Sequence, residues 1–464
     1  MTDRDTSSHR MNRRQVLGGI AAATAASSLA GLPGDAAGAP GSGVSLSAPS
    51  LAQQSTISFS TSGNDTEFEM FDKILDRFEE SQADIRVDRR YDPTLEWPKV
   101  INLLRSGTAA DVQRLNDDSV FMMGSVGAVR ILDDYFDRDL KREDYYDLMY
   151  QERVGPGGTL ASAHVTSAPL VAFFNLDLME EAGITPPTDW VEGNPDMAGW
   201  EEMFAKLLKK SGDRVDVYPF FAPYWQIETA MYNEGVEFFS EDESSTTLYT
   251  PKSVEVVRRW QSWFEKDYFM PEGEDEEQLF NSGNLAIVCA YADFAYRINE
   301  GIRFDIGPTW SGPRVKAFHA GRVFSIPTAS QNPDQAWEVA KWLLTEGQTE
   351  MAEIDWGVPM RKEVAEGQVF LNPEKPIGNH TLLSKAMDVG SIPWPENPVS
   401  EAFQVPFRRL SAVNTGEQTP EEFLTGADSY LTNILTSAGW NKSMNVAGYR
   451  MDDSTFEEAQ PPES

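Results

Sequence analysis

The order of short strands and amphipathic helices constrains the fold of this chain more than any other feature of its sequence. Apolar residues alternate with serines over 57–59, which predicts a strand, and then recur at spacings of three and four over 68–78, which predicts a helix. A second strand over 85–91, a helix that ends at Gly107 and a third strand over 111–115 repeat this order. Strands that alternate with helices predict an α/β unit with a largely parallel sheet.

The same patterns predict a second α/β unit that begins near residue 168. Its first strand is expected over 170–174, where the residues are apolar. Further helices are expected over 177–182, 197–210, 252–266 and 333–344. The helix over 252–266 is expected to bury Val254, Val257, Trp260 and Phe264, which share one face.

The first 55 residues predict export. Two adjacent arginines at 13–14 precede a weakly apolar stretch over 16–32, and this pattern resembles a twin-arginine export signal. We therefore predict a signal over 1–32. Gly, Ala, Ser and Pro dominate the next segment, which predicts a flexible linker over 33–55. Leu32 stands where a lipobox would carry its cysteine, which argues against a lipid anchor. The mature protein is expected outside the cell, at its surface.

The charge of the chain excludes two classes of partner. Acidic residues outnumber basic residues 73 to 39, which gives a formal net charge of −34. Such a charge repels nucleic-acid phosphates and anionic membrane surfaces. An acidic excess of this size, spread along the whole chain, resembles the composition of secreted proteins from extreme halophiles, because high salt screens the self-repulsion.

Cysteine and histidine give no pattern of a metal or cofactor site. The single cysteine, Cys289, lies in the apolar run 285–290 and is expected to pack in the core. The four histidines show no metal-ligand spacing. Beyond the signal, no apolar run is long enough to span a membrane. We therefore expect a monomer that needs neither a metal nor a cofactor.

Five segments of the chain occur in an order and spacing that a known family shares. "LLRSGTAADVQRLNDD" is similar to a "SGTAPDV" strand with the acidic loop after it, and "VAFFNLDLMEEAGITPPTDW" to a crossover of the type "YYNKDLFEEAGIDPPKTW". The other segments are "FEESQADIRVDRRY", "LFNSGNLAIVCAYADF" and "SIPTASQNPDQAWEVAKWLLTEGQTEMA". Together they resemble the extracellular solute-binding proteins of ABC importers, in the sugar-binding family that includes maltose-binding proteins.

This resemblance implies a fold and a function. The fold is a two-lobed, periplasmic-binding-protein-like α/β fold whose hinge-linked lobes close over a ligand. Lobe one would be residues 56–166 plus 312–360, and lobe two would be 167–311 plus 361–464. The implied function is the capture of a small solute, a mono- or oligosaccharide, and its delivery to a permease in the membrane, with no catalytic residues.

Polar residues that follow two predicted strands are the first candidate ligand contacts. In open α/β sheets, ligands lie beyond the carboxyl ends of the strands, and a sugar needs carboxylates and amides for its hydroxyl groups. Asn64 and Asp65 follow the first strand, and Asp117 and Asp118 follow the third, where the resemblance implies ligand-contacting loops. The alternative for all four is helix capping, and for the second pair also a solvated acidic surface.

Aromatic residues supply the faces against which a sugar ring can stack. Tyr224 and Trp225 lie in a loop with prolines, and Trp356 and Trp394 lie beside Gly and Pro residues in segments that resemble cleft rims. Asp293 follows the strand of the cysteine, at a place where many members of the family have a stacking tryptophan. The alternative for each aromatic residue is burial in the core.

The chemistry of these loops favours a neutral sugar, because they are acidic and aromatic. A cationic ligand is compatible with the same residues through cation–π contacts, whereas a phosphate would require arginines at helix N-termini. A secreted glycoside hydrolase with a carboxylate pair is the alternative function. The sequence has no G-x-S-x-G, no HExxH and no phosphate loop. A surface-layer or adhesion protein would show repeats and β-rich stretches, which are not seen.

Overall fold

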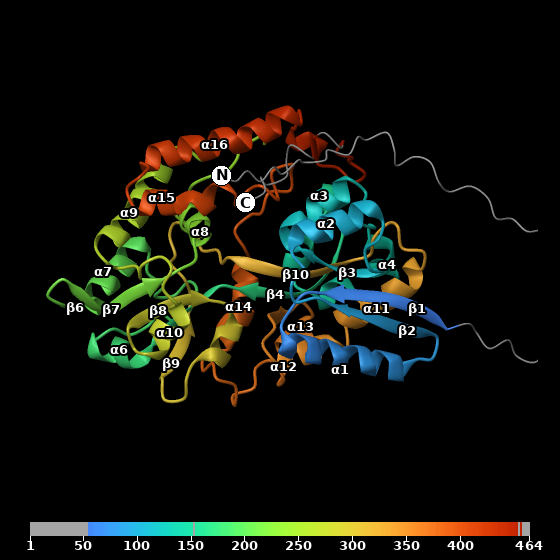
Figure 1. The fold of residues 1–464 in the computed structure, drawn as a ribbon, viewed down its shortest axis with the longest axis horizontal. Helices are drawn as coiled ribbons and strands as arrows, with labels where there is room; N and C mark the ends of the chain where they lie inside the picture. Colours follow the sequence, from blue (N-terminus) through green and yellow to red (C-terminus); the bar gives the residue numbers. More distant parts are fainter. Residues whose placement is uncertain (1–53, 152–153, 453–454, 457–464) are drawn as a thin grey trace, which may run out of the picture. The chain divides into compact units, whose positions relative to one another are not determined.

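The computed structural model describes residues 54–151, 154–452 and 455–456. The predicted export signal and almost all of the predicted linker therefore lie outside the described residues. The described chain is an α/β protein with two separate sheets, each associated with its own helices (Figure 1). None of its helices is both long enough and apolar enough to cross a bilayer.

The first sheet combines a parallel part with an antiparallel part. Strand β1 pairs in parallel with β2 and β3, whereas β10 pairs antiparallel with β3 and β4, giving the order β11-β4-β10-β3-β1-β2. The strands are β1 (Ser55–Thr61), β2 (Ile85–Tyr91), β3 (Val112–Asn116), β4 (Ala163–Pro169), β10 (His319–Ser325) and β11 (Val358–Pro359). The central strand β10 thus comes from a part of the chain far from its neighbours.

Helices from both ends of the sequence cover this sheet. Helix α1 packs on β2 and on α11 and α12, while α11 also packs on β1, β3 and β4. Helix α2 packs on β3 and ends, as predicted, at Gly107, whose φ of +70° is a left-handed conformation that glycine adopts without strain. The helices are α1 (Asp65–Ser81), α2 (Trp97–Ser106), α3 (Val120–Ser125), α4 (Asp133–Asp139), α5 (Leu148–Gln151), α11 (Pro333–Leu344), α12 (Gln348–Glu353) and α13 (Lys362–Ala365).

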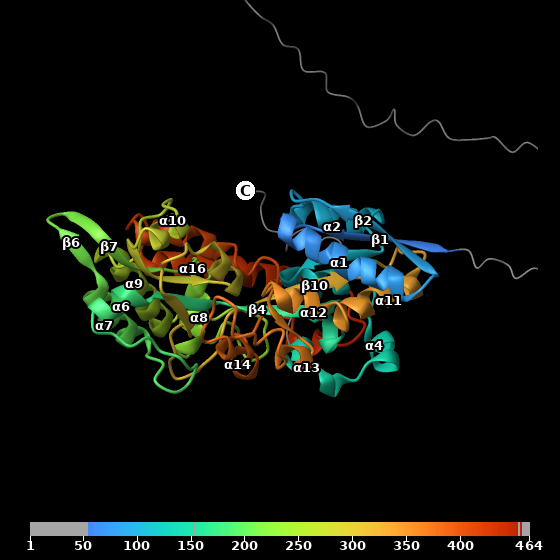
Figure 2. The same ribbon diagram turned by 90° about the horizontal axis from the view of Figure 1, so that it is seen from below.

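The second sheet has the order β6-β7-β8-β5-β9. Helix α7 packs on β7, α10 on β8 and α6 on β5 and β9 (Figure 2). The strands are β5 (Val171–Asn175), β6 (Lys209–Ser211), β7 (Arg214–Phe221), β8 (Leu285–Ala290) and β9 (Phe304–Gly307). The helices are α6 (Leu176–Glu181), α7 (Met197–Leu207), α8 (Gln226–Asn233), α9 (Pro251–Glu265), α10 (Glu276–Asn281), α15 (Leu410–Asn414) and α16 (Pro420–Ser437). Helix α14 (Thr381–Val389) packs on β4 of the first sheet.

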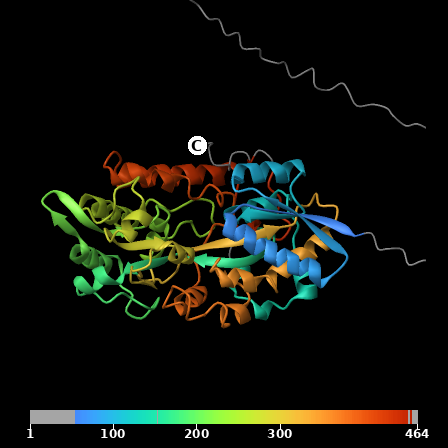
Figure 3. The ribbon, with the colours of Figure 1, turned by 60° about the horizontal axis from the view of Figure 1, so that its bottom comes forward.

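The two sheets are joined by a very short crossing. Only Leu170 separates β4 of the first sheet from β5 of the second, and its N–H donates to the carbonyl of Phe318, which precedes the returning strand β10. In Figure 3, the teal strand β4 and the orange strand β10 run side by side through the middle of the molecule. A third segment joins the crossing, because the Ala317 N–H donates to the Gly390 carbonyl and the Ile392 N–H donates to the Ala317 carbonyl.

The lobe boundaries expected from the sequence, 56–166 with 312–360 and 167–311 with 361–464, stay a prediction. Residues near the C-terminus also contact the first α/β unit, since the Met451 N–H donates to the carbonyl of Ser125.

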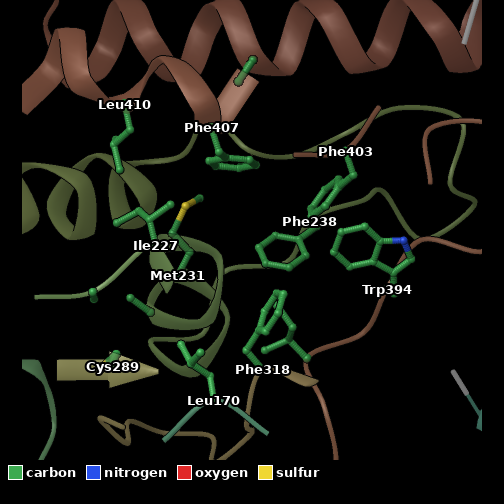
Figure 4. Packing of buried hydrophobic residues seen from close by; sticks show 14 of the residues in the cluster. Leu170, Ile227, Met231, Phe238, Cys289, Phe318, Trp394, Phe403, Phe407 and Leu410 are labelled. Atoms are coloured by element: carbon green, nitrogen blue, oxygen red, sulfur yellow. The ribbon is translucent and has the colours of Figure 1, made fainter. Parts of the chain in front are cut away.

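Aromatic residues dominate the core of the second unit. The rings of Trp200, Trp260, Trp263 and Trp310 lie within about 6 Å of one another in successive pairs and are buried. Cys289 is buried as predicted, and its burial raises the pKa of its thiol well above the usual value (Figure 4).

The structure corrects the predicted face of the helix over 252–266. Trp260 and Val257 are buried, but Val254 and Phe264 are only half-buried. The buried stripe instead runs through Ser253, Val256, Val257, Trp260 and Trp263. Helix α9 packs against α8, α15 and α16, so tertiary contacts rather than its own apolar periodicity choose the buried face.

The predicted helix over 197–210 is too long at its C-terminal end. Helix α7 stops at Leu207, and residues Lys209–Ser211 form β6, which pairs antiparallel with β7 in a hairpin. Gly212, at a φ of +66°, makes the tight turn between the two strands. Strand pairing therefore replaces the last helical turn.

A buried carboxylate connects α12 to two later segments. The Oδ1 atom of Asp355 lies 2.7 Å from Nζ of Lys375 and 2.9 Å from Nε2 of His380, and Oδ2 accepts a hydrogen bond from the Tyr296 hydroxyl at 2.8 Å. The Asp355 side chain is fully buried. Burial and the neighbouring carboxylate raise the pKa of Tyr296 far above its ordinary range, so its hydroxyl stays a donor.

Removal of this charge should destabilise the protein. We predict that Asp355→Asn lowers the free energy of unfolding by about 3 kcal/mol, because it leaves the Lys375 cation buried without a counter-charge. Asn is chosen because it tolerates the positive φ at this position, +51°. Urea unfolding at one fixed salt concentration measures the change. The control is Asp177→Asn, which removes a solvent-exposed partner of Arg303 and should leave the midpoint unchanged. Equal midpoints for both variants would contradict the prediction.

Candidate functional site

A cavity of about 400 Å³ lies where strands of the first sheet end. Ser62 follows β1, Asp117 follows β3, and Arg322 lies in the middle of β10. Trp97 of α2 forms an apolar wall, and Tyr291, which follows β8 of the second sheet, completes the lining. The cavity is therefore built from both α/β units, in the position where open α/β sheets bind ligands.

Asp117 is held at the cavity by the backbone of β10. Its carboxylate accepts a hydrogen bond of 2.6 Å from the N–H of Gly321. A Cβ atom at Gly321 would lie 2.9 Å from Nε2 of His164 and 3.1 Å from Cβ of Asp117, so only glycine allows this approach. The side chain of Asp117 contacts a neighbouring strand and lines the cavity.

Asp118 follows β3 and is half-buried. Burial raises the pKa of Tyr224, Arg408 lowers it, and the charges of Glu228 and Asp118 raise it further. The structure thus places Asp118 within electrostatic range of a predicted aromatic contact from the other unit.

Tyr224 and Trp225 line a second cavity of about 470 Å³ in the second unit. Their rings meet edge to face at a centroid distance of 5.0 Å, and both side chains are half-buried. Trp260 and Arg408 line the same cavity. Tyr224 and Trp225 therefore lie in a cavity wall that does not include Asp117.

Asn64 and Asp65 lie at the start of α1 and are exposed. The Asn64 side chain accepts from the Glu67 N–H, and the Glu67 carboxylate accepts from the Asn64 N–H at 2.8 Å, which is a complete capping box. Asn64 therefore has the capping arrangement that was the alternative to ligand contact. From this turn, Ser62 lines the cavity.

Trp356 is buried behind the cavity, between two arginines. Its indole N–H donates to the Glu67 carboxylate, and its ring meets that of Phe71 edge to face. The guanidinium carbons of Arg114 and Arg322 lie 5.3 Å and 4.6 Å from the ring centroid. Neither arginine was a candidate from the sequence, because both lie inside strands and not in loops.

Two further predicted residues lie away from this cavity. Asp293 is exposed in a short 3-10 helix, and the residue that lines the cavity from this segment is Tyr291. The position of Tyr291 directly after the strand of Cys289 is the sequence signal that could have identified it as a cavity residue. Trp394 is buried and packs edge to face on Phe403, in the core that Figure 4 shows.

Among the described residues, no group of three or more His, Cys, Asp or Glu side chains could hold a metal ion. The cavity instead presents carboxylate, guanidinium and hydroxyl groups beside aromatic faces. Such a lining can bind a polar molecule that has apolar ring faces.

Comparison with known proteins agrees with this arrangement. The family model of bacterial extracellular solute-binding proteins matches residues 73–376. The chain belongs to this family. No curated protein matches the sequence.

Solved structures with the same fold share little sequence with this chain. An ABC substrate-binding protein from Listeria monocytogenes, in complex with cycloalternan, has a TM-score of 0.71 at 17% identity, over 83% of this chain and 100% of that chain. The GacH receptor of Streptomyces glaucescens has a TM-score of 0.69 at 19% identity, over 82% and 99%. The sugar-binding protein MalE from Xanthomonas citri has a TM-score of 0.68 at 18% identity, over 83% and 98%. The predicted two-lobed fold is thereby confirmed.

Another carboxylate connects the segment after Trp394 to the C-terminal residues. Glu396 accepts a hydrogen bond of 3.2 Å from the amide of Asn445, whose oxygen accepts from the N–H of Gly157. Burial, together with repulsion from Glu243, raises the pKa of Glu396 to about 6.

This raised pKa predicts a pH-dependent stability. The folded protein binds the Glu396 proton more tightly than the unfolded chain, so this stabilisation is complete below pH 4.5 and is lost as the pH rises through 6. Glu396→Gln should therefore gain stability relative to the wild type over this window, by up to about 2 kcal/mol at pH 7. Denaturant unfolding from pH 4 to 7.5 measures the difference. A stability difference between Glu396→Gln and the wild type that is equal at pH 4 and at pH 7.5 would contradict the prediction. The control is Glu417→Gln, which changes an exposed glutamate.

Proposed function

We propose that this protein binds a mono- or oligosaccharide outside the cell and delivers it to the membrane permease of an ABC importer. The single observation that carries the proposal is the cavity lined by Asp117, Trp97 and Tyr291, because it offers a hydroxyl acceptor and aromatic faces from two α/β units. Membership in a family of extracellular solute-binding proteins supports the role. Proteins of the same fold are named as binding cycloalternan and maltose.

Closure of two lobes around the ligand is part of this proposal. The lobes would be residues 56–166 with 312–360 and residues 167–311 with 361–464. The narrow crossing at Leu170 supports a hinge there. Across the gap between the units, the Trp97 indole N–H donates to the Glu401 carboxylate at 2.6 Å, which supports a cavity that closes from both sides.

The proposal places the protein at the outer cell surface of a salt-loving organism, as a monomer exported by the twin-arginine signal at 13–14 and without a lipid at Leu32. The formal charge of −34 and the family description support this setting. The proposed role is binding without catalysis, so the ligand should be recovered intact. The proposed ligand contacts in the cavity are Asp117, Trp97 and Tyr291, with Trp356 behind them. Contacts from Asp118, Tyr224 and Trp225 stay predictions.

A thermal-shift screen in multimolar salt tests the proposal. Neutral and acidic sugars, polyols, polyamines and peptides are each added to the protein, and the sugars are analysed afterwards by chromatography. A sugar at 100 times its dissociation constant should stabilise the protein by about 2.7 kcal/mol. If only polyamines or only peptides raised the unfolding temperature, that class would replace sugars as the proposed ligand. Consumption of the sugar would favour the glycoside hydrolase.

Asp117 should contribute directly to ligand binding. We predict that Asp117→Asn weakens sugar binding at least tenfold, because it removes a charged acceptor for a hydroxyl group while an amide oxygen can still accept from Gly321. Titration calorimetry with the sugar found in the screen measures the change. Asp293→Ala, which alters an exposed acid outside the cavity, should bind as the wild type does. Equal losses in both variants would contradict the assignment of the cavity.

A further inference from the structure

Two arginines from neighbouring strands face the candidate cavity. In the antiparallel pair of β3 and β10, Arg322 lies opposite Asn116, so Arg114 and Arg322 are diagonal neighbours on one face of the sheet. A β-bulge follows Arg322 in its pairing with β4, and bulges re-aim side chains. Both arginines line the cavity. The sheet thus brings two cations to one wall of the site.

Trp356 holds the two guanidinium groups together. Its ring centroid lies 5.3 Å from the Arg114 Cζ atom and 4.6 Å from that of Arg322. Guanidinium groups bind aromatic faces through cation–π attraction, which orients them without neutralising their charge. The aromatic contact therefore positions two charges that can bind an anion.

The nearest carboxylates already have backbone and indole donors. Glu67 accepts from the Asn64 N–H and the Trp356 indole, and its oxygen lies 3.8 Å from the Arg322 guanidinium, which is a long ion pair. Asp117 accepts from the Gly321 N–H. These two acids compensate the arginines electrostatically, but among the described residues neither guanidinium has a bidentate carboxylate partner.

The arginines keep donors for a ligand. Arg114 donates to the carbonyl of Ser62 at 2.6 Å, and the Nη1 atom of Arg322 lies 3.8 Å from the Glu67 carboxylate. A guanidinium has five N–H donors, so each arginine has terminal N–H groups beyond these contacts. Burial and repulsion from Arg322 lower the pKa of Arg114 to about 10, which shows that the two like charges interact unfavourably.

We propose that the ligand is an acidic sugar, whose anionic oxygens are bound by Arg114 and Arg322 while its ring and hydroxyl groups meet Trp97, Tyr291 and Asp117. This inference rests on the proposed function and specifies its ligand class. The shared chemistry is an anionic oxygen group on a sugar, either the carboxylate of a uronic acid or a sulfate ester. Both accept two parallel hydrogen bonds from a guanidinium.

The loops alone favour a neutral sugar, because they contain acids and aromatic residues and no arginine. The arginines reach the cavity from within β3 and β10, so the spatial arrangement adds a positive wall to an acidic rim. A cationic ligand would meet this wall at a disadvantage, because like charges would be held close together in a partly buried site.

Matched pairs of sugars test the inference on the full chain. Oligomers of galacturonate are compared with oligomers of galactose of the same length and linkage, glucuronate with glucose, and each neutral sugar with its 6-sulfate. Binding is measured by titration calorimetry at one fixed salt concentration, with inorganic sulfate as a separate probe. We expect the acidic member of at least one pair to bind at least tenfold more tightly than its neutral counterpart. The uronate and sulfate arms identify which anionic group is bound.

Variants then connect this preference to the arginines. Arg322→Gln should abolish the preference for the acidic sugar over its neutral counterpart. Arg322→Lys keeps a charge but no bidentate donor, and should retain part of the preference. Arg303→Gln changes an exposed arginine outside the cavity and should bind as the wild type does.

The failure of this inference is distinguishable from failure of the proposed function. Neutral sugars that bind as tightly as their acidic counterparts would overturn the acidic ligand and leave the sugar-binding role intact. Inorganic sulfate that binds as tightly as the acidic sugars would also overturn it. If no sugar of either kind bound, the proposed function itself would fail. The wild-type comparison decides the question even if an Arg322 variant does not fold.

Discussion

The hydrogen bonding of β10 between β3 and β4 is the constraint on which the rest of this structure depends. Residues His319–Ser325 enter the middle of the first sheet only after the chain has passed through the second unit. The pairing brings Gly321 against Asp117 and Arg322 beside Arg114. The first sheet and the ligand cavity are therefore completed together, by a contact between residues about two hundred positions apart in the chain. Such non-local pairing loses loop-closure entropy before the hydrogen bonds of the completed sheet can stabilise the fold.

Local periodicity was enough to predict much of the fold. The strands β1, β2 and β3 and the helices α1, α2 and α11 follow from apolar spacing and caps that each segment carries by itself. The resemblance to solute-binding proteins predicted the two-lobed arrangement, which the structural comparisons confirm. The errors concern tertiary contacts: the buried face of α9 is chosen by its neighbours, and Lys209–Ser211 forms a hairpin strand because β7 offers a partner.

The candidate site could be predicted only in part, because position after a strand does not give the direction of a side chain. Asp117 was found from its position, and the structure places it at the cavity. Arg114 and Arg322 carry no such signal, since each looks like an ordinary strand residue until β3 and β10 are paired. Trp394 lies between prolines in a segment that resembles a cleft rim, whereas the structure buries its side chain, so its contact with a ligand stays a prediction.

The crossing at Leu170 limits the way in which the two units can move. Because the Leu170 N–H is bonded to the Phe318 carbonyl, the crossing is a ribbon whose strands are locked in register. Residues 390–392 pair with Ala317 beside these two strands, and sliding of this ribbon would break its hydrogen bonds, whereas bending across its thin direction would not. In the proposed closure, a change in the opening angle would need only small backbone rotations in these segments and would leave each sheet intact. In the proposed delivery, a permease that contacts both units would detect a bound ligand through the angle between their surfaces. Such detection needs no coupled change of side chains through the core.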